Sequence, residues 1–484
     1  MSAKPGESLD VTIGLEIHVQ LDTQTKMFCG CSTDYENAEP NTHTCPVCLG
    51  LPGSLPVVNQ KAVEYAVMVG KALDCEIADE TRFHRKNYFY PDLPKNFQIT
   101  QYDAPINQDG SVGLRVGDDE KEVRIRRAHM EEDPGSLVHK GGSIETASHT
   151  LVDYNRSGTP LMEIVTEPDL ETPEEARGFV DKLREILEYL DVFDTEEGGT
   201  IRVDANVSIE VDGEGGNRTE IKNIGSTKGV EKALAYEITR QKNQIKRGAE
   251  IRQETRHYDD DRGITVTLRE KAEEHDYRYF EEADIPVVRV EKFKGEIGIP
   301  ELPDARRERF IDEYGVSDEV AEKLTSKKAV ADFYETVAKD EEVSYGVAST
   351  WVADELLGEL NYRDMTVDEV DVSEFVNLVK MIDEDEITDR NAVEALRDAL
   401  DEGRAPVEIV EERDMKKAGE DVTVEAVEEA IDDNPDAVDD YLSGEEDALN
   451  FLVGQVMQKT GGSADPGTVN QMLRERLDSI AEAE

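Results

Sequence analysis

Alternating apolar and polar residues mark the first half of the chain. From Val11 to Leu21 every second residue is apolar, and the residues between them include Glu16 and His18. A period of two predicts a β-strand with one face on a core and one polar face. This strand would place a carboxylate and an imidazole side by side. The alternative is an ordinary half-exposed antiparallel strand.

Further segments repeat this pattern. Residues 200–211 alternate cleanly, short strands are expected at 219–223 and 263–269, and another follows the polar loop at 153–159. Paired together, such strands predict an antiparallel sheet with helices behind it and a charged front. The charged or polar residues of that front are Glu163, Arg202, Asp204, Asn206, Glu220 and Lys222.

A group of arginines followed by carboxylates lies between these strands. Residues 122–127 end in Arg126 and Arg127, and Glu131 and Glu132 follow closely. Mg²⁺ prefers carboxylate and phosphate oxygens, and arginine forks fit phosphate groups. The segment is therefore a candidate metal and phosphate site. In a chain this acidic, an ordinary surface run is the alternative.

The parity of this segment requires an irregularity. Val123 and Ile125 share parity with His129 and Glu131, so all four would point to one face of a regular strand. If the first two are core residues and the second two face the polar front, a β-bulge is needed near Arg127.

The pattern changes to helical beyond about Lys292. Amphipathic, acidic helices are expected there, with Trp351 in their core, and an apolar helix ends at the glycines after Lys459. The chain is therefore predicted to be α+β, with an antiparallel catalytic domain at 1–291, a helical domain at 292–408 and a small helical tail at 409–484.

Charge is the most unusual feature of the composition. Lys+Arg total 54 and Asp+Glu total 110, which gives a net charge of −56. At molar salt the Debye length falls to about 3 Å, so such a surface indicates a halophile and does not exclude a nucleic-acid partner. The sequence shows no apolar signal core and no run long enough to span a membrane, so a cytoplasmic protein is expected.

Four of the five cysteines form two close pairs. Cys29 and Cys31 are separated by one residue, and Cys45 and Cys48 by two. In a reducing cytoplasm such pairs favour a zinc site over disulfides. Four thiolates leave no open position for catalysis, so we expect the zinc to be structural. Cys75 fits a small core residue at the end of a helix expected over residues 60–73.

Basic residues alternate with aromatic ones at residues 81–95. Arg85, Lys86 and Lys95 lie near Tyr90 and three other aromatic residues. This combination suits phosphate contacts and stacking on unpaired nucleotides. The alternative is a buried aromatic turn with solvated cations.

No phosphate-binding glycine loop, catalytic serine elbow or cysteine–histidine nucleophile is evident in the sequence. From the residues alone the prediction is metal-dependent phosphoryl transfer, or binding of a phosphate ester, with RNA as a further ligand.

Several long motifs resemble the GatB family, which forms part of tRNA-dependent amidotransferases. They include the residues at 14–21, 48–56, 85–95, 129–133, 153–165 and 276–280. The resemblance implies a glutamine-synthetase-like cradle, a helical domain and a YqeY-like tail that binds the tRNA. It also implies partners, namely an A-type glutaminase subunit and a small C-type subunit in a heterotrimer.

The implied reaction uses ATP and Mg²⁺ to convert the side-chain carboxylate of misacylated Asp-tRNA(Asn) or Glu-tRNA(Gln) to an acyl phosphate. Ammonia from the glutaminase partner then displaces phosphate. Carried over by motif, Glu16, His18, Glu131 and Glu132 would bind metal and act in catalysis, with Glu163 and Glu220 as further metal ligands. Lys86 and Lys95 would act in catalysis, and the nucleotide-binding set would be Arg85, Tyr90, Arg202, Asp204, Asn206 and Lys222.

Two alternatives accompany this interpretation. The related GatE subunit carries an inserted domain after the cradle, and residues 286–306 leave no room for one. The other alternative is a noncatalytic, zinc-stabilised tRNA-binding subunit. The sequence does not decide between the two misacylated tRNAs.

Overall fold

The computed structural model describes residues 9–117, 119–141, 147–193, 201–211, 214–270 and 277–483. Thr200 and Asp276, which begin two of the sequence motifs, lie outside these residues. The chain divides into two compact units, Met1–Leu302 and Pro303–Glu484. The predicted boundaries at 291 and 408 stay predictions.

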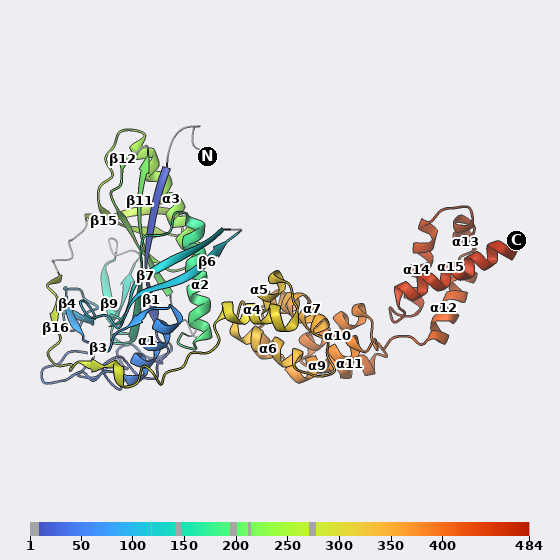
Figure 1. Ribbon diagram of the computed structural model, residues 1–484, viewed down its shortest axis with the longest axis horizontal. Coiled ribbons are helices and arrows are strands. Elements are labelled where there is room, and N and C mark those ends of the chain that lie inside the picture. The colour runs from blue at the N-terminus through green and yellow to red at the C-terminus, as the bar shows by residue number, and fades with distance from the viewer. Residues whose placement is uncertain are drawn as a thin grey trace. The chain divides into compact units, whose positions relative to one another are not determined.

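A ten-stranded sheet forms the centre of the first unit (Figure 1). Its neighbouring strands are antiparallel, apart from the parallel pair β13 and β14. The strand order is β15 (Ile264–Glu270), β14 (Glu254–Asp259), β13 (Thr219–Ile224), β11 (Ile201–Val211), β1 (Leu9–Gln20), β10 (Pro160–Thr166), β7 (Asp119–Glu132), β6 (Asn107–Val116) and β2 (Glu76–Ile77), with β12 (Glu214–Gly215) paired to β11.

Three helices cover the apolar face of this sheet. They are α1 (Gln60–Ala72), α2 (Pro173–Tyr189) and α3 (Thr227–Ile245), and each begins after a side chain that caps its first turn. The caps are Asn59, Thr172 and Ser226, whose oxygens accept free backbone N–H groups of the helix. Apolar residues of β1, β7, β10 and β11 pack with these helices in one continuous core. The predicted α+β architecture with helices behind an antiparallel sheet is confirmed.

The expected β-bulge is present in β7. Val165 of β10 pairs with Arg127, whereas the next residue, Thr166, pairs with Ile125. Arg126 is therefore the extra residue, and the core face passes from Val123 and Ile125 to Ala128 and Met130. Beyond the bulge, the odd-numbered residues point to the polar front.

Smaller sheets lie around the main one. The strand β4 (His84–Asn87) lies between β5 (Phe97–Thr100) and β16 (Phe280–Glu281), so the basic–aromatic segment meets residues distant in sequence. Two further pairs are β3 (Glu80–Thr81) with β17 (Val288–Arg289), and β8 (Ser136–Lys140) with β9 (His149–Asp153).

The second unit is helical in the residues described. Trp351 and Val352 are buried in it, as the sequence predicts, and a separate apolar cluster joins its last four helices. The helices are α4 (Pro303–Tyr314), α5 (Asp318–Thr325), α6 (Lys328–Ala338), α7 (Tyr345–Thr350), a π-helical turn (Trp351–Leu356), α8 (Leu357–Arg363), α9 (Val372–Asp383), α10 (Asp389–Glu402), α11 (Pro406–Glu412), α12 (Glu420–Asp433), α13 (Pro435–Leu442), α14 (Asp447–Lys459) and α15 (Pro466–Ala483).

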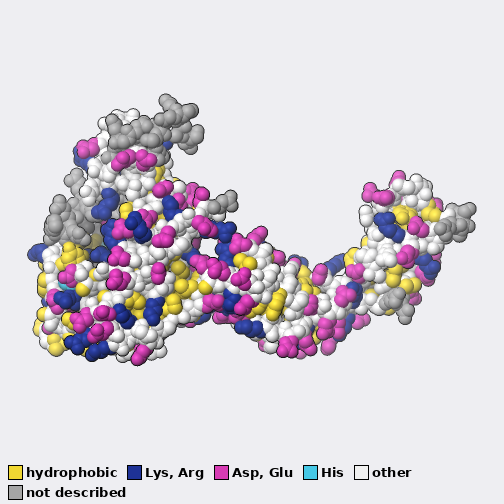
Figure 2. All heavy atoms as spheres, in the orientation of Figure 1, with side chains coloured by type: hydrophobic (Ala, Val, Ile, Leu, Met, Phe, Trp, Pro, Cys, Tyr) yellow, Lys and Arg dark blue, Asp and Glu magenta, His cyan; other side chains and the backbone are white. Residues whose placement is uncertain are grey.

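Acidic side chains are scattered over the visible face of the molecule (Figure 2). Many of them pair with arginines, as Asp169 does with Arg124 and Glu167 with Arg126. Among the described residues, no helix is long and apolar enough to cross a membrane.

Candidate metal and acyl-transfer site

A first acidic group forms where three strands lie side by side. His18 of β1 is paired in register with Glu163 of β10, and Glu163 with His129 of β7. His18 Nε2 lies 3.3 Å from Glu163 Oε2 and 3.8 Å from Glu131 Oε1. Ligand atoms of His18, Glu131 and Glu163 all lie within 4.8 Å of one another, which is close enough for one divalent ion.

A second acidic group lies further along the same face. Glu16 of β1 is paired with Asp204 of β11, and Glu220 of β13 completes the group within 4.8 Å. Lys222 Nζ lies 2.7 Å from Asp204 Oδ2 and 3.2 Å from Glu220 Oε1. Asn206 donates to Glu16 Oε1 at 3.0 Å. These side chains present several oxygens of the kind Mg²⁺ prefers, with one ammonium among them.

Burial and mutual repulsion set the electrostatics of the first group. Burial and the charge of Glu163 raise the pKa of Glu131 to about 7. Burial disfavours a charged His18, but its hydrogen bond to Glu163 and the neighbouring carboxylates raise its pKa to about 9. Burial lowers the pKa of His129 to about 4, so this imidazole is neutral near pH 7.

The second group is also held close together against repulsion. Burial and the charges of Glu163 and Glu220 raise the pKa of Glu16. Burial opposes a charged Lys222, but Asp204 and Glu220 raise its pKa, so the ammonium persists. Carboxylates crowded in this way gain from a bound cation, since it removes their repulsion.

Lys86 is a cation that lies close to the first group. Its burial opposes charge, but Glu131 and Glu163 raise its pKa. Its ammonium lies 5.2 Å from the centre of the Tyr277 ring, within a cation–π arrangement. Tyr279 stacks on Tyr102 at 4.2 Å between ring centres. The basic–aromatic segment therefore borders the acidic front of the sheet.

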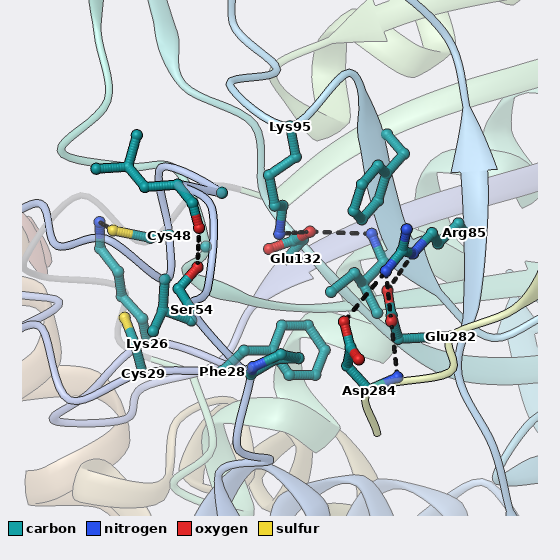
Figure 3. Close-up of a pocket in the computed structure, with 17 residues that line it drawn as sticks. Lys26, Phe28, Cys29, Cys48, Ser54, Arg85, Lys95, Glu132, Glu282 and Asp284 are labelled. Carbon is teal, nitrogen blue, oxygen red and sulfur yellow. Dashed lines mark hydrogen bonds and ion pairs between the residues drawn. The ribbon is translucent and has the colours of Figure 1, made fainter. Parts of the chain in front are cut away.

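Glu132 is separated from both acidic groups. It has the parity of Ala128 and Met130, and it forms an ion pair with Lys95 and accepts a hydrogen bond from the Ile99 backbone N–H at 2.9 Å. Both side chains line a pocket of about 190 Å³ (Figure 3). Phe28, Phe97, Cys29 and Cys48 line the same pocket, so it lies between the carboxylate strand and the cysteines.

Two of the predicted phosphate- or nucleotide-binding residues have carboxylate partners. Arg85 makes a two-pronged ion pair with Glu282, at 2.5 and 2.8 Å (Figure 3). Arg202 lies 3.2 Å from Asp133, whose side chain is fully buried. Both guanidinium groups are thus engaged in ion pairs. A third predicted residue, Tyr90, has an exposed side chain.

The four predicted zinc ligands converge. One sulfur atom from each of Cys29, Cys31, Cys45 and Cys48 lies within 4.8 Å of the others, a donor set that suits a tetrahedral zinc ion. The Cys45 backbone N–H donates to Cys48 Sγ at 3.1 Å. The geometry fits a metal such as zinc.

Two supporting residues could not be found by reading motifs. Lys26 is fully buried, donates to the backbone oxygens of His43 and Tyr154, and lies beside Cys48. Thr255 donates to Glu220 from β14, a strand that the alternation of apolar residues does not reveal. Neither residue carries a local signal, because its role depends on partners distant in sequence.

Together, the sheet and its two acidic groups define an α+β domain of the metal-binding, catalytic class. A family model described as the GatB/GatE catalytic domain matches residues 11–294, and one described as the GatB domain matches residues 332–477. The chain therefore belongs to the GatB family.

Curated relatives agree with this assignment along their whole lengths. The chain is 62% identical to a protein of Natronomonas pharaonis, over 99% of this chain and 100% of the relative. It is 61% identical to one of Halobacterium salinarum, over 99% of each, and 54% identical to one of Methanococcoides burtonii, over 97% and 98%. All three are named as the same subunit of an aspartyl/glutamyl-tRNA(Asn/Gln) amidotransferase.

Proposed function

We propose that this chain is the GatB-type subunit of a tRNA-dependent amidotransferase. It converts Asp on tRNA(Asn), Glu on tRNA(Gln), or both, to the corresponding amide. Membership of the GatB family, with relatives of this name matched end to end, carries the proposal. The relatives are named as subunits, so we infer partner chains, namely an A-type glutaminase and a small C-type subunit.

The chemistry needs an activated carboxylate. A carboxylate is a poor acyl donor, so the γ-phosphoryl group of ATP is transferred to its oxygen and ADP leaves. The nitrogen of ammonia then attacks the carbonyl carbon, phosphate departs, and the nitrogen loses a proton. Catalysis of this kind consists mainly of positioning and charge neutralisation.

The two acidic groups are the proposed Mg²⁺ sites. His18, Glu131 and Glu163 would hold one ion, and Glu16, Asp204 and Glu220 the other. Bound Mg²⁺ would neutralise phosphate charge during transfer. Lys86 and Lys222 add positive charge beside the two groups, where the transferred phosphoryl oxygens would lie. Asn206 would orient Glu16 through its hydrogen bond.

The pocket that Lys95 and Glu132 line is the proposed entry for ammonia. Glu132 follows Glu131 directly, so the pocket approaches the carboxylate strand from the other side. Exposed apolar side chains lie on the segments around it, among them Leu51, Leu55 and Phe280. We infer that the glutaminase subunit docks there, because an apolar seal would keep ammonia from escaping into water.

Amidation by the assembled complex tests the function. The chain would be combined with its A-type and C-type partners in molar KCl with glutamine, ATP and each misacylated tRNA in turn. Amide formed in step with ADP would support the proposal and assign the substrate. Binding of tRNA without ADP or amide would favour the alternative, a noncatalytic zinc-stabilised tRNA-binding subunit.

A further inference from the structure

Thr255 donates a hydrogen bond to a carboxylate of the second acidic group. Its Oγ1 lies 3.0 Å from Glu220 Oε2. The exposed fractions are 1% for Thr255 and 7% for Glu220, so bulk water cannot easily replace this donor. A buried hydrogen bond to a charged oxygen is both strong and directional.

The contact arises from the parallel pairing in the sheet. β13 and β14 place Thr255 directly beside Glu220 in register. On its other edge, β14 shifts register against β15 between Thr255 and Arg256. Neighbouring residues of a strand point to opposite faces, so Thr255 faces the acidic group while Arg256 points toward α3.

Arg256 fixes β14 on the helix behind the sheet. Arg256 Nε lies 3.4 Å from Glu237 Oε2 of α3, and Glu237 is fully buried. Thr265 of β15 donates to the same carboxylate oxygen at 2.8 Å and accepts from Arg256 Nε at 2.8 Å. This network restricts movement of β14, and with it the position of the Thr255 hydroxyl.

We propose that Thr255 is a positioning residue for divalent metal binding, which acts by fixing the orientation of the Glu220 carboxylate. Lys222 Nζ lies 3.2 Å from Glu220 Oε1, and without Thr255 the carboxylate would turn toward this ammonium. Donors that orient a metal-binding side chain commonly change metal affinity when removed. The inference depends on the proposed Mg²⁺ site formed by Glu16, Asp204 and Glu220.

Mn²⁺ binding to the full-length, zinc-loaded chain tests the inference without using activity. Free Mn²⁺ would be followed by electron paramagnetic resonance in molar KCl, and E220Q identifies the relevant site. T255V replaces the hydroxyl by a methyl group of similar size and should weaken that site by about tenfold or more. T255S restores the donor and should bind within about threefold of the wild type.

Thr219 provides a matched control. It precedes Glu220, is fully buried, and its hydroxyl has no hydrogen-bond partner among the described residues. T219V should therefore leave Mn²⁺ affinity unchanged. Circular dichroism would check folding, and if T255V does not fold, T255A carries the same expectation.

The outcomes separate the two proposals. Wild-type affinity in T255V, at a site that E220Q removes, would overturn the positioning role alone. Mn²⁺ binding that E220Q does not alter would refute the metal site and the role of Thr255 together. Equal weakening in T255V and T255S would also overturn the inference, since the donor is present in the second variant.

Discussion

Lys26 Nζ lies 4.0 Å from Cys48 Sγ, inside the core of the first unit. The hydrogen bond from Cys29, aided by the charge of Lys26, lowers the pKa of the Cys48 thiol to about 5. Zinc bound by four thiolates carries net negative charge, and a buried ammonium offsets part of it. Lys26 thus links the cysteine cluster to the backbone at Tyr154.

Zinc content should therefore follow both the cysteines and this lysine. We expect one zinc ion per chain, its loss in C48A, and a weaker but measurable site in K26M. Loss of zinc should lower the free energy of unfolding by about 3 kcal/mol or more. Metal analysis and urea unfolding would measure both effects. C75A is the control, because Cys75 lies outside the cluster; zinc retained by C48A would refute the assignment.

Glu131→Gln tests the first acidic group. The substitution keeps the size of the side chain but removes one charged oxygen ligand from a group of three. We expect ADP formation and amidation to fall by about 10²-fold or more. Binding of tRNA should change little, because Glu131 is only 2% exposed. E167Q, on an exposed pair with Arg126, should keep nearly full activity. Undiminished amidation by E131Q would remove Glu131 from the mechanism.

The buried Glu237 predicts how stability depends on pH. Burial opposes its charge, but hydrogen bonds from Arg240, Gln241 and Thr265 lower its pKa below 4.5. A depressed pKa stabilises the fold above the unfolded-state value, and this stabilisation is lost as the pH falls through the folded-state value.

E237Q should therefore destabilise the protein by about 3 kcal/mol at pH 7, because it leaves Arg240 and Arg256 short of a buried counter-charge. Urea unfolding between pH 7 and pH 3 would show a smaller loss of stability in E237Q than in the wild type. A variant that loses stability with acid as steeply as the wild type would contradict this explanation.

Salt dependence follows from the net charge of −56. At 0.1 M salt the Debye length is about 10 Å, so neighbouring carboxylates repel, whereas at 1 M it is about 3 Å. We expect the melting temperature and the amidation rate to rise with KCl from 0.1 M to above 1 M. Maximal activity below about 0.2 M would argue against adaptation to high salt. Relatives in Halobacterium salinarum and Natronomonas pharaonis agree with the expectation.

Alternation in the sequence was enough to place most of the front of the sheet. It put Glu16, His18 and Asp204 on polar faces, and the strand pairing then brought these faces together. Parity also located the bulge near Arg127, because Val123 and Glu131 could not share one side. These features are local, so a single sequence contains them.

Long-range pairing was not accessible in this way. The strand β14 is almost entirely polar, and its parallel neighbour is a separate segment of the chain, so neither Thr255 nor its contact with Glu220 could be anticipated. Glu132 appeared beside Glu131 in the motif, and its separation from the acidic groups became visible only with β5 in place. Arg85 and Arg202 suited phosphate by type, but their carboxylate partners come from distant segments.

The bulge at Arg126 has a consequence for how two reagents reach one reaction. Downstream of it, adjacent residues of β7 serve opposite sides of the sheet: Glu131 belongs with His18, and Glu132 with Lys95. Under the proposed function, the sheet is then a partition between a wet, phosphate-handling compartment and a sheltered nitrogen supply. A single inserted residue allows one strand to serve both compartments.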